Sequence, residues 1–133
     1  MAELVAAALT RDGYQADFTP ASLWEIDRFF DEHTRKGVPR RWGLLEKDTS
    51  VRLFSVGAYV GEVIRRELGG EWEGDDEDGQ AELNLALRLP DDGIVWPVQQ
   101  AVARMRNGGK DGLVAYAAAL GVEAGPKPGR RKG

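Results

Sequence analysis

The most constraining feature of this sequence is one long apolar stretch, residues 50–69, that has helical periodicity and carries two glycines four residues apart. Asp48 and Thr49, just before it, are residue types that cap the beginning of a helix. A glycine inside a helix costs about 1 kcal/mol relative to alanine. We therefore expect another backbone to pack closely against Gly57 and Gly61. The same helix face carries Leu53, Val60, Ile64 and Leu68.

The clearest strand signal lies in residues 83–89, where leucine occupies every second position. This alternation predicts a strand with one face in the core. Shorter strands are predicted at residues 71–73 and 94–96. An acidic turn at 74–79 and a second turn at 90–93 would connect the three into an antiparallel meander.

Helices are predicted on both sides of this meander, from apolar periodicity bounded by glycine and proline. Segregated helices and strands indicate an α+β fold, with a small antiparallel sheet of about three strands packed against several helices. The alternation from Tyr14 to Phe18 also predicts a strand. The further helices are expected at residues 3–12, from Pro20 to about 35, from Pro97 to about 107 and at 113–120, with a loop at 37–43 that contains Arg40, Arg41 and Trp42.

Length and charge predict a single domain with an acidic body. A chain of 133 residues is of ordinary single-domain size. The formal charge is −4, to which residues 123–133 contribute +3, and this leaves −7 for residues 1–122. We expect residues 1–122 to form the globular domain and 123–133 a flexible basic tail. An acidic body repels the nucleic-acid backbone and anionic membranes, so neither is the expected partner.

Several classes of function lack the residues they need. The absence of cysteine excludes disulfides and thiolate chemistry. No stretch approaches the roughly 18 apolar residues of a membrane helix, and the first ten residues lack the basic start of a secretory signal. We therefore expect a cytoplasmic protein that does not enter a membrane.

The possible cofactor and metal motifs also lack the residues or the spacing that such sites require. His33, the one histidine, follows an apolar helical stripe and has no second histidine or cysteine to complete a metal site or a triad, so a structural role is expected. The acidic residues from Glu71 to Asp78 do not have calcium-loop spacing, which favours a solvated hairpin turn. Residues 108–112 lack the spacing of a phosphate-binding loop. We expect no metal and no cofactor.

Four residues remain as candidates for a binding site: Glu62, Arg65, Trp72 and Trp96. Glu62 and Arg66 have the i, i+4 spacing of a surface ion pair, which is one interpretation. In the other, Glu62, Arg65 and the ring of Trp72 or Trp96 line a groove beside the sheet, because binding surfaces favour tryptophan with arginine.

Four segments together resemble a group of small bacterial domains of unknown function. They run from Phe54 to Arg66 (FSVGAYVGEVIRR), from Leu68 to Trp72 (LGGEW), from Leu87 to Pro90 (LRLP) and from Val95 to Pro97 (VWP). The resemblance covers residues 54–120 and implies a glycine-notched helix, a hairpin and a helix that begins at an aromatic-proline pair. It implies no catalytic residues.

These observations favour binding over catalysis. The leading hypothesis is a noncatalytic binding or regulatory module that docks on a bacterial protein partner, as an immunity or adaptor protein does. The alternative is a carboxylate-dependent enzyme that uses Glu62 or the acidic turn on a small molecule. Nucleic-acid binding through the tail ranks third. The oligomeric state stays open, because the Gly57 and Gly61 face can pack on its own sheet or on a partner.

Overall fold

The computed structural model describes residues 2–73 and 86–127, and it has the expected α+β architecture. The periodic segments form helices close to the predicted bounds, which confirms those predictions. Pro97 begins α4 as expected, and Gly121 ends α5 with a left-handed backbone. The helices are α1 (Ala2–Arg11), α2 (Ser22–His33), α3 (Thr49–Leu68), α4 (Pro97–Asn107) and α5 (Leu113–Leu120), with a 3-10 turn, η1 (Gly108–Asp111), between the last two.

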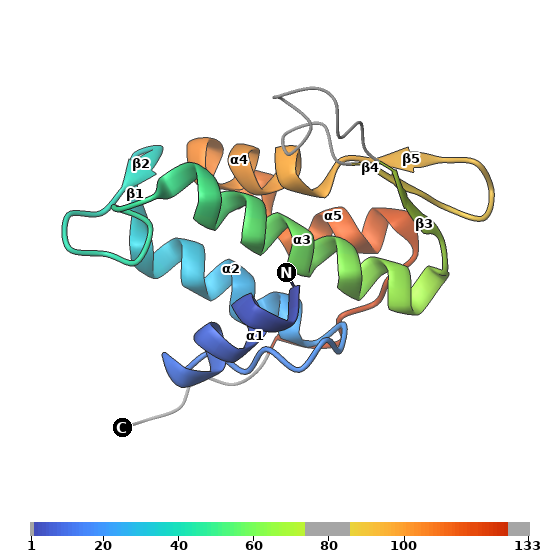
Figure 1. Cartoon of the computed structure of the whole chain (residues 1–133), viewed down its shortest axis with the longest axis horizontal. Helices are drawn as coiled ribbons and strands as arrows, with labels where there is room; N and C mark the ends of the chain where they lie inside the picture. Colours follow the sequence, from blue (N-terminus) through green and yellow to red (C-terminus); the bar gives the residue numbers. More distant parts are fainter. Residues whose placement is uncertain (1, 74–85, 128–133) are drawn as a thin grey trace.

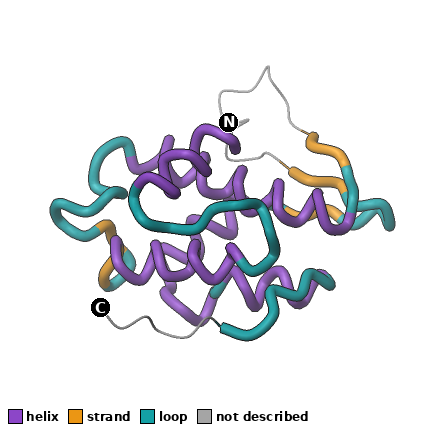
Figure 2. Tube along the Cα trace, turned by 90° about the horizontal axis from the view of Figure 1, so that it is seen from below, coloured by secondary structure: helices purple, strands orange, loops and turns teal. Residues whose placement is uncertain are grey.

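Two small antiparallel sheets lie at opposite ends of the helical body (Figures 1 and 2). The predicted meander is confirmed as β3 (Glu71–Glu73), β4 (Ala86–Arg88) and β5 (Ile94–Val95), in that spatial order. The acidic turn and the first half of the leucine alternation fall within residues 74–85, outside the described residues. The other sheet, a hairpin of β1 (Thr34–Arg35) and β2 (Val38–Pro39), has no counterpart in the sequence-based prediction.

The strand predicted from Tyr14 to Phe18 is wrong. This segment is irregular, because Phe18 has a φ of 63° that breaks an extended run. The backbone N–H of Phe18 donates instead to the hydroxyl of Tyr59 at 2.9 Å. Helix α2 also ends two residues before the predicted bound, since Thr34 is extended and its hydroxyl donates to the Phe30 carbonyl.

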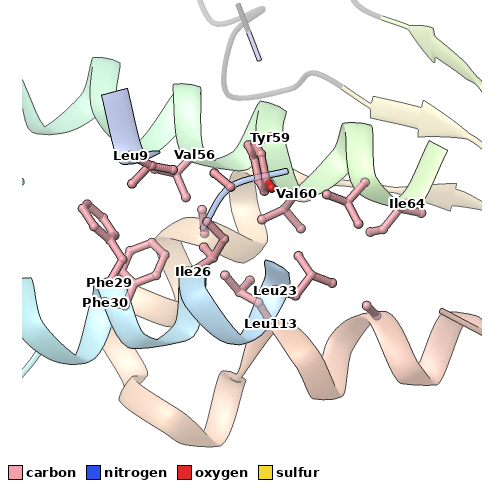
Figure 3. Close-up of a cluster of buried hydrophobic side chains, with 14 of the residues drawn as sticks. Leu9, Leu23, Ile26, Phe29, Phe30, Val56, Tyr59, Val60, Ile64 and Leu113 are labelled. Atoms are coloured by element: carbon pink, nitrogen blue, oxygen red, sulfur yellow. The ribbon is translucent and has the colours of Figure 1, made fainter. Parts of the chain in front are cut away.

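Helix α3 runs through the middle of the molecule, packed on α4 and α1 (Figure 1). Residues 56–64 are all buried, so the helix is enclosed on every side over more than two turns. The predicted close approach of another backbone is confirmed at Gly57, whereas at Gly61 the nearest neighbours are the side chains of Trp72 and Pro97. A Cβ at Gly57 would lie 2.5 Å from the Cα of Val98, and one at Gly61 would overlap the Trp72 ring. Figure 3 shows Val56, Tyr59, Val60 and Ile64 of α3 facing Leu23, Ile26, Phe29 and Phe30 of α2 in the core.

The chain stays packed on the body past the expected boundary at residue 122. Val122 and Ala124 are buried, and the Trp24 indole N–H donates to the Gly125 carbonyl at 3.1 Å. The end of the predicted tail, residues 128–133, lies outside the described residues. None of the helices in the described ranges is both long and apolar enough to cross a membrane.

Candidate binding surface

The structure brings together three of the four candidate residues: Glu62, Arg65 and Trp72. Arg65 binds Glu62 through two hydrogen bonds, from Nε at 2.8 Å and Nη2 at 2.6 Å. Arg66 Nε adds a third at 3.0 Å, and the Trp72 indole N–H a fourth at 3.2 Å. Helical spacing supplies the two arginines, and strand β3 supplies the tryptophan. The Glu62 carboxylate is therefore a meeting point of α3 and the sheet.

Electrostatics keep this carboxylate ionised. The hydrogen bond from Arg65, with those from Arg66 and Trp72, outweighs burial and lowers the pKa of Glu62 to about 2. A general acid or base needs a pKa near the working pH and an open hydrogen-bonding position. Glu62 has neither, because its oxygens are occupied by four donors. Its chemistry is that of a structural anchor.

Trp96 lies apart from this cluster. In the sheet register Trp72 is opposite Leu87, and Leu87 is opposite Val95. Because side chains alternate along a strand, the residue after Val95 does not share the row that holds Trp72. Trp96 is 41% exposed, and Pro97 rather than Trp96 reaches the Gly61 position beside the Trp72 ring. Of the two tryptophans considered for this surface, Trp72 therefore joins Glu62 and Arg65, and Trp96 does not.

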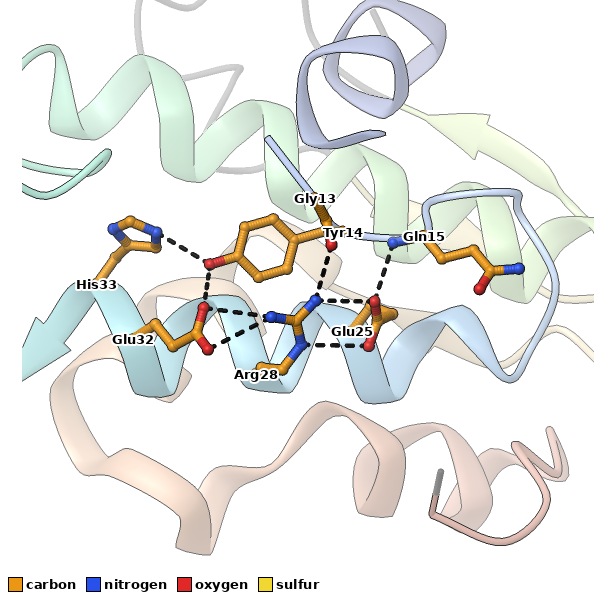
Figure 4. Close-up of polar contacts among 7 residues, drawn as sticks. All are labelled: Gly13, Tyr14, Gln15, Glu25, Arg28, Glu32 and His33. Carbon is orange, nitrogen blue, oxygen red and sulfur yellow. Dashed lines mark hydrogen bonds and ion pairs between the residues drawn. The ribbon is translucent and has the colours of Figure 1, made fainter. Parts of the chain in front are cut away.

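A second polar cluster surrounds Tyr14, below α1 (Figure 4). The Tyr14 hydroxyl donates to Glu32 and lies 3.0 Å from Nε2 of His33. Arg28 stacks on the Tyr14 ring at 4.4 Å and binds both Glu25 and Glu32. Burial, with the Glu32 hydrogen bond, raises the pKa of Tyr14. The tyrosine thus stays protonated and fastens the segment after α1 onto α2.

His33 has the structural role expected of it. Its Nδ1 accepts the backbone N–H of Leu44 at 3.0 Å, so the proton of the neutral ring is on Nε2, which points at Tyr14. Burial lowers the pKa of His33 and favours this neutral form. The ring therefore connects the end of α2 to the loop that precedes α3.

That loop belongs to a strongly basic segment, residues 35–52, which we call the basic end. It contains six basic residues and two acidic ones in an otherwise acidic chain. Within residues 2–73 and 86–127, no hydrogen bond or ion pair engages the side chains of Arg35, Lys36 or Lys47. Positive charge at this end is thus left available to a partner.

The loop at the basic end is held firmly from beneath. Leu45 is fully buried in the core, and Arg52 of α3 donates to the Leu44 carbonyl at 2.6 Å. Arg40 Nε binds the Thr34 carbonyl at 3.1 Å. With the His33 contact, these bonds attach the loop to α2, β1 and α3. Its outward side chains are presented on a fixed backbone.

Trp42 is the most exposed large apolar side chain of the basic end. It is 84% exposed, the highest value among the large apolar residues described. Its φ of 67° is uncommon for a bulky residue and costs on the order of 1 kcal/mol. The Arg41 guanidinium lies 5.5 Å from its ring centroid, and Val38 and Val51 are more than half exposed.

Sequence reasoning placed Trp42 in a loop but did not select it as a site residue. The available signal was a tryptophan after two arginines, in a glycine- and proline-bounded loop that offers no helical or strand period to bury it. A buried position could not be excluded from the pattern alone. Its 84% exposure separates Trp42 from the half-buried Trp72.

Similarity to known proteins gives no information about this site. No protein-family model, no curated protein and no solved structure matches the chain. The resemblance to small bacterial domains stays a prediction. Across the described ranges, no group of three or more histidine or acidic side chains is arranged to hold a metal ion.

Proposed function

We propose that this protein is a noncatalytic binding module that docks the acidic surface of a protein partner on its basic end, with Trp42 as the anchor. The observation that carries this proposal is an 84% exposed tryptophan, held on a strained backbone in a loop that is fastened to the core. Backbone strain that leaves a large apolar ring in solvent, covered in part by the Arg41 guanidinium, points to a role outside the fold.

The composition of the surface supports a protein partner. Tryptophan and arginine are enriched among the residues that dominate protein interfaces. Six large apolar side chains are exposed among the described residues, and three of them, Val38, Trp42 and Val51, fall within residues 38–51. Unpaired basic side chains around them would steer an acidic partner to this end. The −7 charge of residues 1–122 opposes a polynucleotide.

The alternative of a Glu62-based enzyme receives no support from the geometry. Such an enzyme needs a carboxylate with a raised pKa that faces an open cleft. The four hydrogen bonds to Glu62 lower its pKa instead. We place the module in the bacterial cytoplasm, as an adaptor-like or immunity-like protein.

The test uses site-specific cross-linking in the native host. A photoreactive amino acid at position 42 should capture one protein, and the same group at position 96 should not. With that partner purified, Trp42→Ala should weaken binding by about thirtyfold, as loss of an interface anchor does. Trp96→Ala is the matched control, because Trp96 is also exposed but lies beside the other sheet.

Charge-reversal variants of the basic end provide an independent test. Arg41→Glu with Lys47→Glu should abolish binding at physiological salt and leave the melting temperature unchanged, because neither side chain is paired with a carboxylate in the described chain. Equal capture from positions 42 and 96 would overturn the proposal. Capture that disappears on nuclease treatment would also overturn it, in favour of nucleic-acid binding.

A further inference from the structure

A small hollow lies between the β1–β2 hairpin and the C-terminal end of α4. It has a volume of about 260 Å³, and its lining includes Arg35, Lys36, Arg104 and Arg106. The hairpin is held tightly against the helix, since a Cβ at Gly37 would lie 2.9 Å from the Arg106 carbonyl oxygen. Four basic residues from two separate elements thus border one cavity.

Arg104 forms the floor of this hollow. Its side chain is only 2% exposed, and its Nε and Nη2 bind the Asp27 carboxylate at 2.9 Å, the Asp27 carbonyl at 2.9 Å and Asp31 at 2.7 Å. The remaining nitrogen, Nη1, has no hydrogen-bond partner in the described chain. No side-chain nitrogen there is both sealed from solvent and unpartnered, so Nη1 keeps some solvent exposure, and Arg104 is one of the residues that line the hollow.

Asp27, which binds Arg104, is itself held in place by the beginning of α5. The Asp27 carboxylate accepts the backbone N–H groups of Leu113 at 2.9 Å and Val114 at 3.1 Å, at the beginning of α5. Arg104 therefore connects α4 to α2 and, through Asp27, to α5. Its free N–H groups are fixed in direction before any ligand arrives, which lowers the entropic cost of binding.

The charge balance favours a doubly charged anion. Arg35, Lys36, Arg104 and Arg106 together carry a charge of +4, and Asp27 and Asp31 carry −2. The net charge of these six residues is therefore +2. The side chains of Arg35, Lys36 and Arg106 are exposed, with no ion pair in the described chain. The C-terminal end of a helix exposes carbonyl oxygens that repel an anion. At the end of α4 the Arg104 carbonyl already accepts the Gly108 N–H, and Gly37 packs against the Arg106 carbonyl.

We propose that this hollow binds a phosphate monoester dianion, with Arg104 Nη1 donating from the floor and Arg35, Lys36 and Arg106 closing around the remaining oxygens. Arginine forks match phosphate geometry, and a phosphate monoester carries close to two negative charges at neutral pH. The phosphate can belong to a free small molecule or to a phosphorylated side chain. The site does not need Trp42.

The experiment is an NMR titration of the full chain at constant ionic strength, with inorganic phosphate, with acetyl-Gly-phosphoserine-Gly-amide and with the unphosphorylated peptide. Saturable shifts of the Gly37 and Gly108 amides and the Arg104 Nε–H are expected with the first two ligands only. Lys36→Ala with Arg106→Ala should raise the dissociation constant at least about tenfold. Its melting temperature should be unchanged, because both side chains are exposed.

The matched control, Arg41→Ala with Lys47→Ala, removes the same charge from outside the lining and should leave phosphate binding unchanged. A peptide that binds at least about tenfold tighter than free phosphate identifies a phosphorylated side chain as the source; equal affinities identify a small molecule. Absence of saturable shifts at the three reporters, or equal weakening by both double variants, overturns the site. Trp42→Ala should not affect this titration, so the result is independent of the proposed docking function.

Discussion

The basic residues near the two ends of helix α3 differ in their partners. Near its C-terminal end, Arg65 and Arg66 converge on Glu62, and Trp72 completes the set. Before its N-terminal end, Arg41 contacts only the Trp42 ring, and Lys47 has no hydrogen bond or ion pair within the described residues. The first group of charges is satisfied within the fold, whereas in the second Arg40 and Arg52 bind backbone carbonyls and Arg41 and Lys47 have no carboxylate partner among the described residues.

This difference separates structural charges from available ones. Residues three and four apart on a helix face one another, so a glutamate followed by arginines at that spacing pairs within the fold. Arg41 and Lys47, in the loop before α3, have no such neighbour among the described residues. We therefore expect substitutions in the Glu62 cluster to lower stability, and substitutions at the basic end to lower binding with stability retained.

The largest expected effect is that of Glu62→Ala. The change removes the acceptor that Arg65, Arg66 and the Trp72 indole N–H share, although Arg66 keeps Glu3 at 3.5 Å. The free energy of unfolding should therefore fall by about 2–3 kcal/mol, measured by urea denaturation. Glu67→Ala, on the exposed side of the same helix, should change it by less than about 0.5 kcal/mol, as should Arg41→Ala. If all three variants are equally stable, the Glu62 cluster is as dispensable to the fold as the basic end.

A smaller loss in the free energy of unfolding is expected from Gly61→Ala. The new methyl group would occupy the place of the Trp72 ring, which must shift and weaken its bond to Glu62. The expected loss is about 1–2 kcal/mol, despite the higher helix propensity of alanine. Tryptophan fluorescence should report the movement of Trp72.

Gly109→Ala provides the matched control for this substitution. Nothing lies within 4 Å of a Cβ at Gly109, so we expect a change within about 0.5 kcal/mol. A Gly61→Ala variant as stable as Gly109→Ala would show that Trp72 is loosely seated, and it would contradict the account of the Glu62 cluster.

Features set by short separations along the chain could be predicted from the sequence. The Glu62 cluster is of this kind, because Arg65 and Arg66 lie within one turn and Trp72 is on the strand that follows directly. The close packing at Gly57 and Gly61 followed from the energetic cost of glycine in a helix. The β3–β4–β5 order followed from alternation and turns, although the leucine face could not be followed into residues 83–85.

Features that depend on distant contacts could not be predicted. The segment from Tyr14 to Phe18 alternates like a strand, but tertiary bonds to Glu32 and Tyr59 hold it in an irregular path. The exclusion of Trp96 from the cluster depends on the register between β4 and β5. Arg104 looked like one more polar residue of an amphipathic helix, and only its contacts with α2 show that it is buried.

The smallest expected effect concerns the attachment of the basic end to α2. Burial lowers the pKa of His33 below its ordinary value of 6.5, so the stabilisation from the neutral ring is complete above that pH. It decreases as the pH falls below 6.5 and toward the lowered folded-state pKa, because the ring takes up a proton once it is released, and a protonated Nδ1 cannot accept the Leu44 N–H. Loss of this bond should cost roughly 1 kcal/mol locally.

Amide hydrogen exchange at pH 7.5 and 5.5, corrected for intrinsic rates, measures this effect directly. The protection of Leu44 should fall at the lower pH, whereas that of Val60, in the enclosed part of α3, should hold. Glu32 and Asp12 on one side and Arg40 on the other act on the same ring in opposite directions. If the protection of Leu44 follows that of Val60 at both pH values, the loop is held by Leu45 and Arg52 alone, and its rigidity does not depend on the protonation of His33.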